Sequence, residues 1–163
     1  MIGAKAADRL VVSGANEPDL IAQIALVTGL NGRTLVIDGD ASAREGVEAA
    51  AASAGALVEV ADTPAATDDN SFDVAVVLTP LGLKPPAERE AVLGGVFRLL
   101  RPGGRTVVID GERQRGLRAA FAQKSSTLPE GAAIALLERA GHRVQRKLGD
   151  VEGLAYYEGV KSR

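Results

Sequence analysis

Short apolar runs alternate along this chain with longer segments in which apolar residues recur every three or four positions. The short runs are rich in valine and isoleucine, a composition typical of strands that are buried on both faces of a parallel sheet. The pattern predicts strands at residues 10–13, 34–37, 57–60, 72–78, 106–109, 142–148 and 154–160. It predicts helices at residues 18–28, 42–55, 85–100 and 130–140. This alternation of strand and helix indicates an α/β fold.

Several of the predicted boundaries carry their own signals. Ser42 and Glu45 are spaced as a capping box at a helix start, and Gly55 is the expected stop of the same helix. The sequence RPGG at 101–104 is expected to end the third helix. Residues 149–153 join the last two strands so briefly that these strands must form an antiparallel hairpin.

Two segments are expected to be irregular, and the last strand raises the question of where its tyrosine side chains point. Residues 62–71 are a polar link with turn composition, and residues 111–129 form an irregular basic segment that is expected to hold one short helix around 117–121. In the last strand, Tyr156 and Tyr157 are expected to point in opposite directions, one into the core and one outward, because side chains alternate along a strand.

Size and composition fit one soluble globular domain. The chain has 163 residues, 46% of them hydrophobic and 25% charged, and no linker divides it, so residues 1–163 are predicted to form a single domain. A net charge of −2 disfavours a surface for nucleic-acid phosphates. The absence of cysteine excludes disulfides, a thiolate nucleophile and cysteine-ligated metal, and no metal site is predicted. No signal peptide or membrane span is seen in the sequence, so a cytoplasmic location is expected.

Two stretches carry a family resemblance. The sequence SFDVAVVL at 71–78, followed after a helix by VFRLLRPGGRTVVID at 96–110, resembles the fourth strand, next helix and fifth strand of class I S-adenosylmethionine-dependent methyltransferases. LERAGHRVQRKLGD at 137–150 and LAYYEGVKSR at 154–163 are similar to the closing helix and strands of that family. The resemblance covers nearly the whole chain. It implies a three-layer, doubly wound, seven-stranded sheet that is mostly parallel with an antiparallel C-terminal strand.

The resemblance also implies where the cofactor S-adenosylmethionine binds. Asp38, at the end of the second predicted strand, matches the acid that accepts hydrogen bonds from the ribose hydroxyls; a strand-end turn role is the alternative, and Asp40 is a competitor. Asp62 matches the acid that binds the adenine amino group, with an exposed loop cap as the alternative. Leu78 and Thr79, at the end of the fourth strand, are further candidate cofactor contacts. A doubly wound sheet binds ligands at these strand ends on general grounds.

The glycine-rich loop of the family departs from the pattern here. Only Gly14 remains of its three glycines, and apolar Val12 stands where the family has an acid. Asn16 is a candidate cofactor contact that can adopt a left-handed backbone, and Pro18 suits the first position of a helix. Glu17 or Asp19 is a candidate substitute for the missing acid.

Methyl transfer from a sulfonium needs mainly orientation of the two reactants, so no catalytic residue is predicted. The Asn/Asp-Pro-Pro-aromatic turn of amino-group methylases of DNA and some proteins is absent, and aromatic residues are only 3% of the chain. Nucleic acid is therefore disfavoured as a partner, and a small-molecule acceptor is predicted. Basic residues within 111–124 are read either as a lid over an anionic acceptor or as a solvated loop or oligomer contact. A second subunit in a homo-oligomer would be another cover for the site.

Other functions remain weaker alternatives. His142, the sole histidine, is predicted to have a structural or surface role. A serine hydrolase is disfavoured because no Gly-x-Ser-x-Gly turn is present, and a nicotinamide-binding domain stays a minor alternative because Gly14 lacks the partners of a Gly-x-Gly-x-x-Gly loop. The main rival to a methyltransferase is a catalytically inactive methyltransferase-like module for interaction or assembly.

Overall fold

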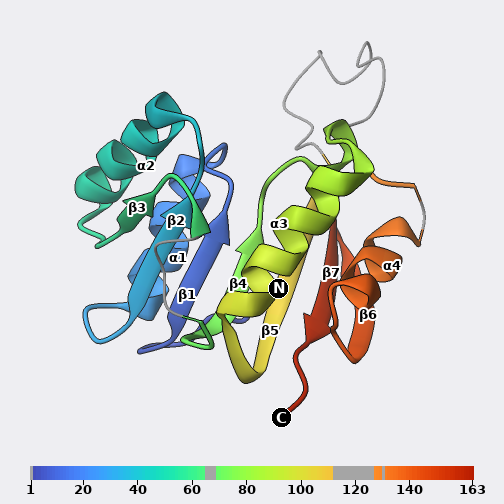
Figure 1. Ribbon diagram of the computed structural model, residues 1–163. Helices are drawn as coiled ribbons and strands as arrows, with labels where there is room; N and C mark the ends of the chain where they lie inside the picture. The colour runs from blue at the N-terminus through green and yellow to red at the C-terminus, as the bar shows by residue number, and fades with distance from the viewer. Residues whose placement is uncertain (1, 65–68, 112–126, 130) are drawn as a thin grey trace.

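Seven strands form a single sheet in the computed structural model, which describes residues 2–64, 69–111, 127–129 and 131–163 (Figure 1). The strand order is β3-β2-β1-β4-β5-β7-β6, and only β7 runs antiparallel to its two neighbours. The strands are β1 Arg9–Ser13, β2 Arg33–Ile37, β3 Glu59–Ala61, β4 Phe72–Val77, β5 Leu100–Gly111, β6 Val144–Val151 and β7 Leu154–Val160. This topology confirms the predicted fold class.

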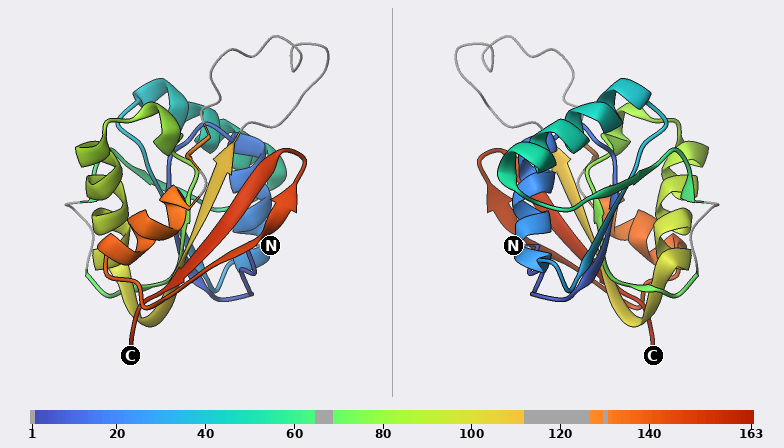
Figure 2. Two further views of the ribbon diagram at one scale, coloured as in Figure 1. Left: turned by 90° about the vertical axis from the view of Figure 1, so that its right-hand side faces the viewer. Right: turned by 90° about the vertical axis from the view of Figure 1, so that its left-hand side faces the viewer.

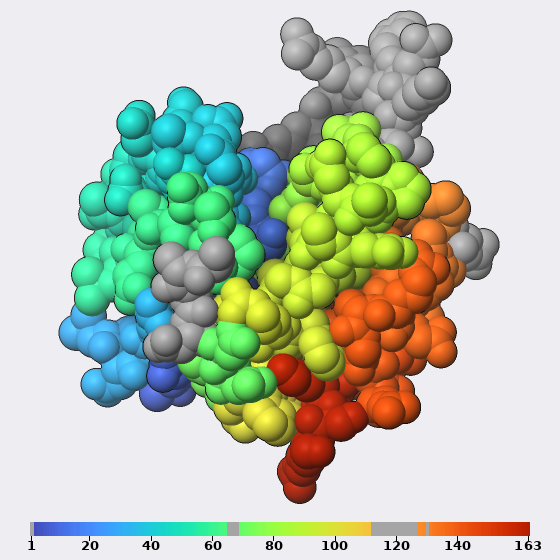
Figure 3. Space-filling view, in the orientation of Figure 1, coloured from blue at the N-terminus to red at the C-terminus, as the bar shows by residue number. Residues whose placement is uncertain are grey.

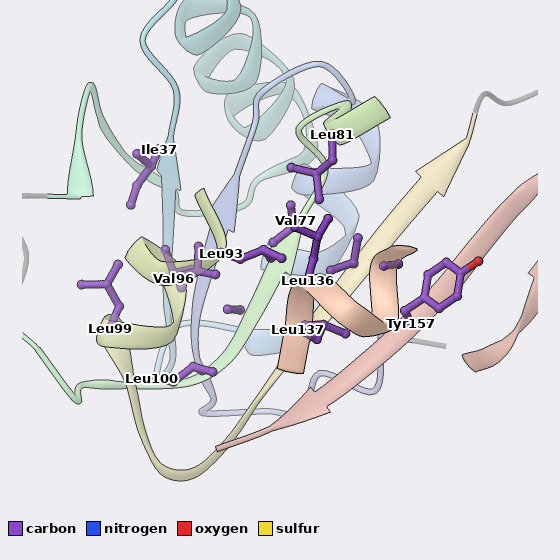
Figure 4. Packing of buried hydrophobic residues seen from close by; sticks show 14 of the residues in the cluster. Ile37, Val77, Leu81, Leu93, Val96, Leu99, Leu100, Leu136, Leu137 and Tyr157 are labelled. Atoms are coloured by element: carbon purple, nitrogen blue, oxygen red, sulfur yellow. The ribbon is translucent and has the colours of Figure 1, made fainter. Parts of the chain in front are cut away.

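Helices cover both faces of the sheet, giving three layers (Figure 2). They are α1 Pro18–Thr28 and α2 Ala41–Ala54 on one face, and α3 Pro86–Leu99 and α4 Ala132–Arg139 on the other. Along β1, Leu10 and Val12 pack toward α1, whereas Val11 packs toward α3, because successive side chains point to opposite faces. Figure 4 shows the cluster of buried residues on the α3–α4 face of the sheet, which includes Leu93 of α3 and Leu136 of α4. Each fully buried side chain of this kind stabilises the fold by about 1.5–3 kcal/mol.

Helix α2 begins one residue earlier than the predicted capping box. Asp40 is the N-cap, and its Oδ1 accepts a hydrogen bond from the Ser42 backbone N–H at 2.9 Å. The prediction that Ser42 caps this helix is therefore wrong, because Asp40 precedes it with the extended backbone and short carboxylate that a cap requires. Gly55 ends the helix in a left-handed conformation, as predicted.

Measurements of protein stability can test whether Asp40 or Ser42 caps helix α2. Asp40→Ala is expected to lower the free energy of unfolding by about 1 kcal/mol, because the Ser42 N–H loses its partner. Ser42→Ala is the matched control and is expected to change it by less than about 0.5 kcal/mol. Urea denaturation of both variants decides between the two caps, and a larger loss for Ser42→Ala would contradict this assignment.

Strand β5 is longer than predicted. The RPGG sequence ends α3 at Leu99 as expected, but β5 then starts at Leu100, not at 106. The reason is a pairing that the local sequence does not show: the Gly103 N–H donates to the Lys161 carbonyl, and the Lys161 N–H donates to the Gly104 carbonyl. The RPGG segment is thus held by the C-terminal end of the chain.

Other boundaries differ by a few residues. Strand β3 ends at Ala61 and leaves Leu57 exposed, and β6 continues to Val151, so the hairpin turn is only Glu152 and Gly153. Helix α4 begins at Ala132, after the predicted start at 130. The short helix predicted at 117–121 lies outside the described residues.

Both tyrosines of β7 are buried, so the prediction that one of them faces outward is wrong. Tyr156 belongs to the core cluster beside α1, and Tyr157 to the cluster beside α3 and α4. They do point to opposite faces, as expected. Both faces of β7 are covered, because buried residues pack against the sheet on the α1 side and on the α3–α4 side.

Candidate functional site

A cleft opens at the carboxyl ends of β1, β2 and β4, beside α3. Its volume is about 470 Å³, within the range of about 300–1,000 Å³ that is common for small-molecule sites. Figure 3 shows the surface hollowed between α2 (cyan) and α3 (lime). The lining residues are Ser13, Ile37, Asp38, Gly39, Asp62, Pro64, Thr79, Pro80, Lys84, Ala91, Val92 and Val96.

The β1–α1 loop, residues 14–17, follows Ser13 of the cleft and is tightly fixed at Gly14. Gly14 has φ +98°, and a Cβ placed on it would lie 2.6 Å from the Thr79 backbone nitrogen. Its own N–H donates to the Ile37 carbonyl at 2.9 Å. Glycine is therefore required here by both backbone conformation and space.

Asn16 does not act as a substitute glycine. Positive φ outside glycine occurs, within the described part of the chain, at Ala7, Asn70 and Glu152, so the expectation of a left-handed Asn16 is wrong. The turn forms without it because Pro18 takes the first position of α1, where its missing N–H is tolerated.

Asp38 lies at the centre of the cleft's polar side. Its Oδ2 accepts a hydrogen bond from the Ala15 N–H at 2.8 Å, and its Oδ1 accepts one from the Asp40 N–H at 2.9 Å. An ionised carboxylate has about four acceptor positions, so each oxygen can accept a further hydrogen bond from a ligand. The carboxylate thus ties the β1–α1 loop to β2 and retains capacity toward the cleft.

The other predicted site residues divide between two places. Asp62 and Thr79 line the cleft with Asp38, whereas Asn16 and Leu78 line a separate cavity of about 30 Å³ on the α1 side. Leu78 is buried in the core cluster beside α1. The structure brings three of the six candidates together, places Gly14 directly against Thr79, and puts Asn16 and Leu78 elsewhere.

Two polar lining residues were not predicted from the sequence. Ser13 ends β1, and its hydroxyl lies 3.1 Å from the Thr79 hydroxyl at the end of β4. Lys84 follows a short 3-10 helix, η2 Leu81–Leu83, and its Nζ lies 3.2 Å from the Glu88 carboxylate. The position of Ser13 at a strand end, beside Gly14, was a usable signal; Lys84 lies in a turn with no periodic pattern.

Asp110, near the end of β5, is a buried acid. Burial raises the pKa of the Asp110 carboxyl, an effect opposed by backbone hydrogen bonds from Leu128 and Gly111 and by the charge of Arg89. The Leu128 N–H donates to Asp110 Oδ2 at 2.8 Å. Asp110 does not line the cleft and serves to fasten the backbone at Leu128.

Comparison with known proteins identifies the fold. No protein-family model matches the chain, and no curated protein matches it in sequence. Solved structures do: a SAM-dependent methyltransferase from Aquifex aeolicus superposes with a TM-score of 0.78 at 18% identity, over 98% of this chain and 85% of that one. A TehB-like SAM-dependent methyltransferase from Corynebacterium glutamicum gives 0.68 at 15% identity, over 98% of this chain and 83% of that one.

A third neighbour is considerably longer than this chain. The arsenic(III) S-adenosylmethionine methyltransferase CrArsM from Chlamydomonas reinhardtii superposes with a TM-score of 0.68 at 20% identity, and 96% of this chain covers only 63% of that protein. At these identities the likeness shows the fold. The resemblance to class I methyltransferases predicted from the motifs is therefore confirmed at the level of the fold.

Two further observations concern metals and membranes. Within the described ranges, no group of three or more His, Cys, Asp or Glu side chains is placed to hold a metal ion. No helix among the residues that the structure describes is long and apolar enough to span a membrane.

Proposed function

We propose that this protein binds S-adenosylmethionine in the cleft and transfers its methyl group to a small-molecule acceptor. The observation that carries the proposal is the position of Asp38, whose carboxylate lines a cleft of about 470 Å³ at the carboxyl ends of the central strands. Ligands of doubly wound sheets bind at this edge. The fold shared with SAM-dependent methyltransferases supports the choice of ligand.

The order of the lining residues fits an extended nucleoside. Asp62, Asp38, Ser13 and Thr79 follow the ends of β3, β2, β1 and β4, which are consecutive neighbours in the sheet. Asp62 would hold the adenine end and Asp38 the ribose hydroxyls, which leaves the two hydroxyl side chains for the sulfur end. Adjacent strands are about 4.8 Å apart, so this row of side chains is long enough for a ligand of this shape.

In this proposal the residues of the cleft mainly orient the cofactor and the acceptor and exclude water. The cofactor supplies an activated methyl group, so the protein needs no nucleophile of its own. Ala91, Val92 and Val96 of α3, with Pro64 and Pro80, give the cleft an apolar wall. An acceptor with a small apolar body is the class that such a wall fits.

The alternative is a catalytically inactive methyltransferase-like module. It is favoured by the β1–α1 loop, which keeps a single glycine, and by Val12 of β1, which is buried where the family has an acid. Isothermal titration calorimetry with S-adenosylmethionine and S-adenosylhomocysteine separates the two functions. Binding of either compound at micromolar to low-millimolar concentration is the expected result, and absence of binding by both would overturn the methyltransferase proposal.

Asp38→Asn is expected to weaken S-adenosylhomocysteine binding at least about tenfold, equivalent to about 1.4 kcal/mol. The amide keeps the shape of the side chain but loses the charge and one acceptor oxygen, which the ribose hydroxyls would share with a backbone N–H of Ala15 or Asp40. Calorimetry measures the dissociation constant. Asp19→Asn is the control: Asp19, a candidate substitute for the missing acid from the sequence, is exposed on α1, does not line the cleft and carries the same charge. Equal weakening by both substitutions would reject the assignment of Asp38.

A further inference from the structure

The β1–α1 loop does not line the cleft, and its first two backbone donors are already engaged within the protein. The Gly14 N–H donates to the Ile37 carbonyl, and the Ala15 N–H donates to the Asp38 carboxylate. Pro18, at the first position of α1, has no N–H. Glu17, the N-cap residue, adds a negative charge at the place where a helix dipole would otherwise attract an anion. A carboxylate on the ligand therefore needs another partner.

Lys84 is the one cationic side chain among the described residues that line the cleft. The turn that carries it is held in place: the Lys84 N–H donates to the Leu81 carbonyl at 3.1 Å, and Arg89 Nε donates to the Lys84 carbonyl at 2.7 Å. Arg89 Nη2 also donates to the Gly82 carbonyl at 3.3 Å. The guanidinium of Arg89 thus holds the turn in place. The Lys84 side chain is one-third exposed, and its ammonium donates to the exposed Glu88 carboxylate at 3.2 Å, a kind of pair that contributes little stability.

The charges of the cleft are separated along its length. Asp62 and Asp38 follow β3 and β2, while Lys84 lies beyond the end of β4, on the opposite side of β1. A nucleoside bears hydroxyl and amino donors that suit the acidic end. The amino-acid end of S-adenosylmethionine bears a carboxylate that suits the basic end. Only one orientation of the ligand satisfies both ends.

We infer that Lys84 binds the carboxylate of the cofactor's amino-acid end and replaces the anion contacts that the β1–α1 loop does not provide. This inference rests on the proposed function. Glu88 competes for the same ammonium, because its carboxylate lies 3.2 Å from Lys84 Nζ. Glu88 therefore limits the affinity of the site for the cofactor.

Two ligands that differ only at the amino-acid end provide the test. S-adenosylhomocysteine has the carboxylate, and 5′-methylthioadenosine has the same adenosine and sulfur without it. Lys84→Met keeps the length and apolar stem of the side chain. It is expected to weaken S-adenosylhomocysteine binding about tenfold and to leave 5′-methylthioadenosine binding within about twofold of wild type.

The Glu88→Gln variant gives an effect of the opposite sign. Removing the competing carboxylate is expected to tighten S-adenosylhomocysteine binding about threefold, with no change for 5′-methylthioadenosine. Glu90→Gln is the matched control: Glu90 lies on the same helix, pairs with Arg139 and does not line the cleft, so neither ligand should be affected. A merely structural role of the Lys84–Glu88 pair would change both ligands in the same direction.

The outcomes separate the inference from the proposed function. Suppose that wild type binds both ligands. If Lys84→Met then weakens the binding of both ligands equally, or changes the binding of neither, the role of Lys84 is wrong but the cofactor site is supported. If Glu88→Gln weakens S-adenosylhomocysteine binding, the competition between Glu88 and the ligand is wrong. If wild type binds neither ligand, both the cofactor proposal and the role of Lys84 are rejected.

Discussion

Replacing Gly14 with alanine is expected to lower the free energy of unfolding by about 3 kcal/mol. A residue with φ +98° is strained for any side chain, and the new Cβ would lie 2.6 Å from the Thr79 backbone nitrogen and 3.0 Å from its hydroxyl oxygen. Neither β1 nor β4 can move away, because the Leu78 and Thr79 N–H groups both donate to the Ser13 carbonyl. Urea denaturation measures the loss. In the fraction that still folds, calorimetry should detect no binding of S-adenosylhomocysteine.

Gly39→Ala is the control for this experiment. Gly39 lines the same cleft at the end of the neighbouring strand, but its φ is not positive and a Cβ would meet no atom within 4 Å. Its substitution is expected to change stability by less than about 0.5 kcal/mol. A Gly14→Ala variant as stable as Gly39→Ala would show that the contact between the β1–α1 loop and Thr79 is not rigid.

The fold could be predicted from the sequence because the strands are short apolar runs and the helices have clear periods. The bounds of α1 are the same in prediction and structure, since Pro18 and Gly29 mark its two ends. Elements whose ends depend on distant partners were harder to predict. Strand β5 starts early because Lys161, far along the chain, pairs with Gly103 and Gly104.

In the candidate site, too, some residues could be predicted from the local sequence and others could not. Asp38 and Asp62 were predictable because the ends of parallel strands gather at one edge of the sheet. Leu78 and Thr79 are adjacent in sequence, yet one packs into the core beside α1 and the other lines the cleft. Choosing between them needs the register of β4, since a shift of one residue exchanges the two faces. Lys84 needs the path of the turn after β4, which no local pattern gives.

His142 illustrates a residue whose role the sequence left open between structure and surface. Its side chain is 2% exposed and lies edge-on to the Phe97 ring, with the centroids 4.9 Å apart. Nδ1 lies 3.0 Å from the Leu137 carbonyl oxygen and Nε2 lies 2.8 Å from the Thr106 hydroxyl. Because a carbonyl only accepts, Nδ1 donates to the Leu137 carbonyl, and in a neutral imidazole Nε2 would accept from the Thr106 hydroxyl. The role of His142 is therefore structural.

His142→Ala is expected to lower the free energy of unfolding by about 3 kcal/mol, because it leaves a cavity and removes the partner of the buried Thr106 hydroxyl, while the Leu137 carbonyl keeps only the backbone N–H of residue 142. Arg143→Ala, at the exposed neighbouring position, should have little effect.

Burial lowers the pKa of His142 below its usual 6.5, helped by the nearby Lys161 charge. The unfolded chain thus binds a proton more readily than the native protein, and wild type should lose stability as the pH falls below about 6.5. The difference between wild-type and His142→Ala stability, measured by urea denaturation from pH 7.5 to about pH 5, should shrink across this range. A constant difference would show that His142 takes up its proton equally well in the folded state, and an alanine variant as stable as wild type would reject its structural role.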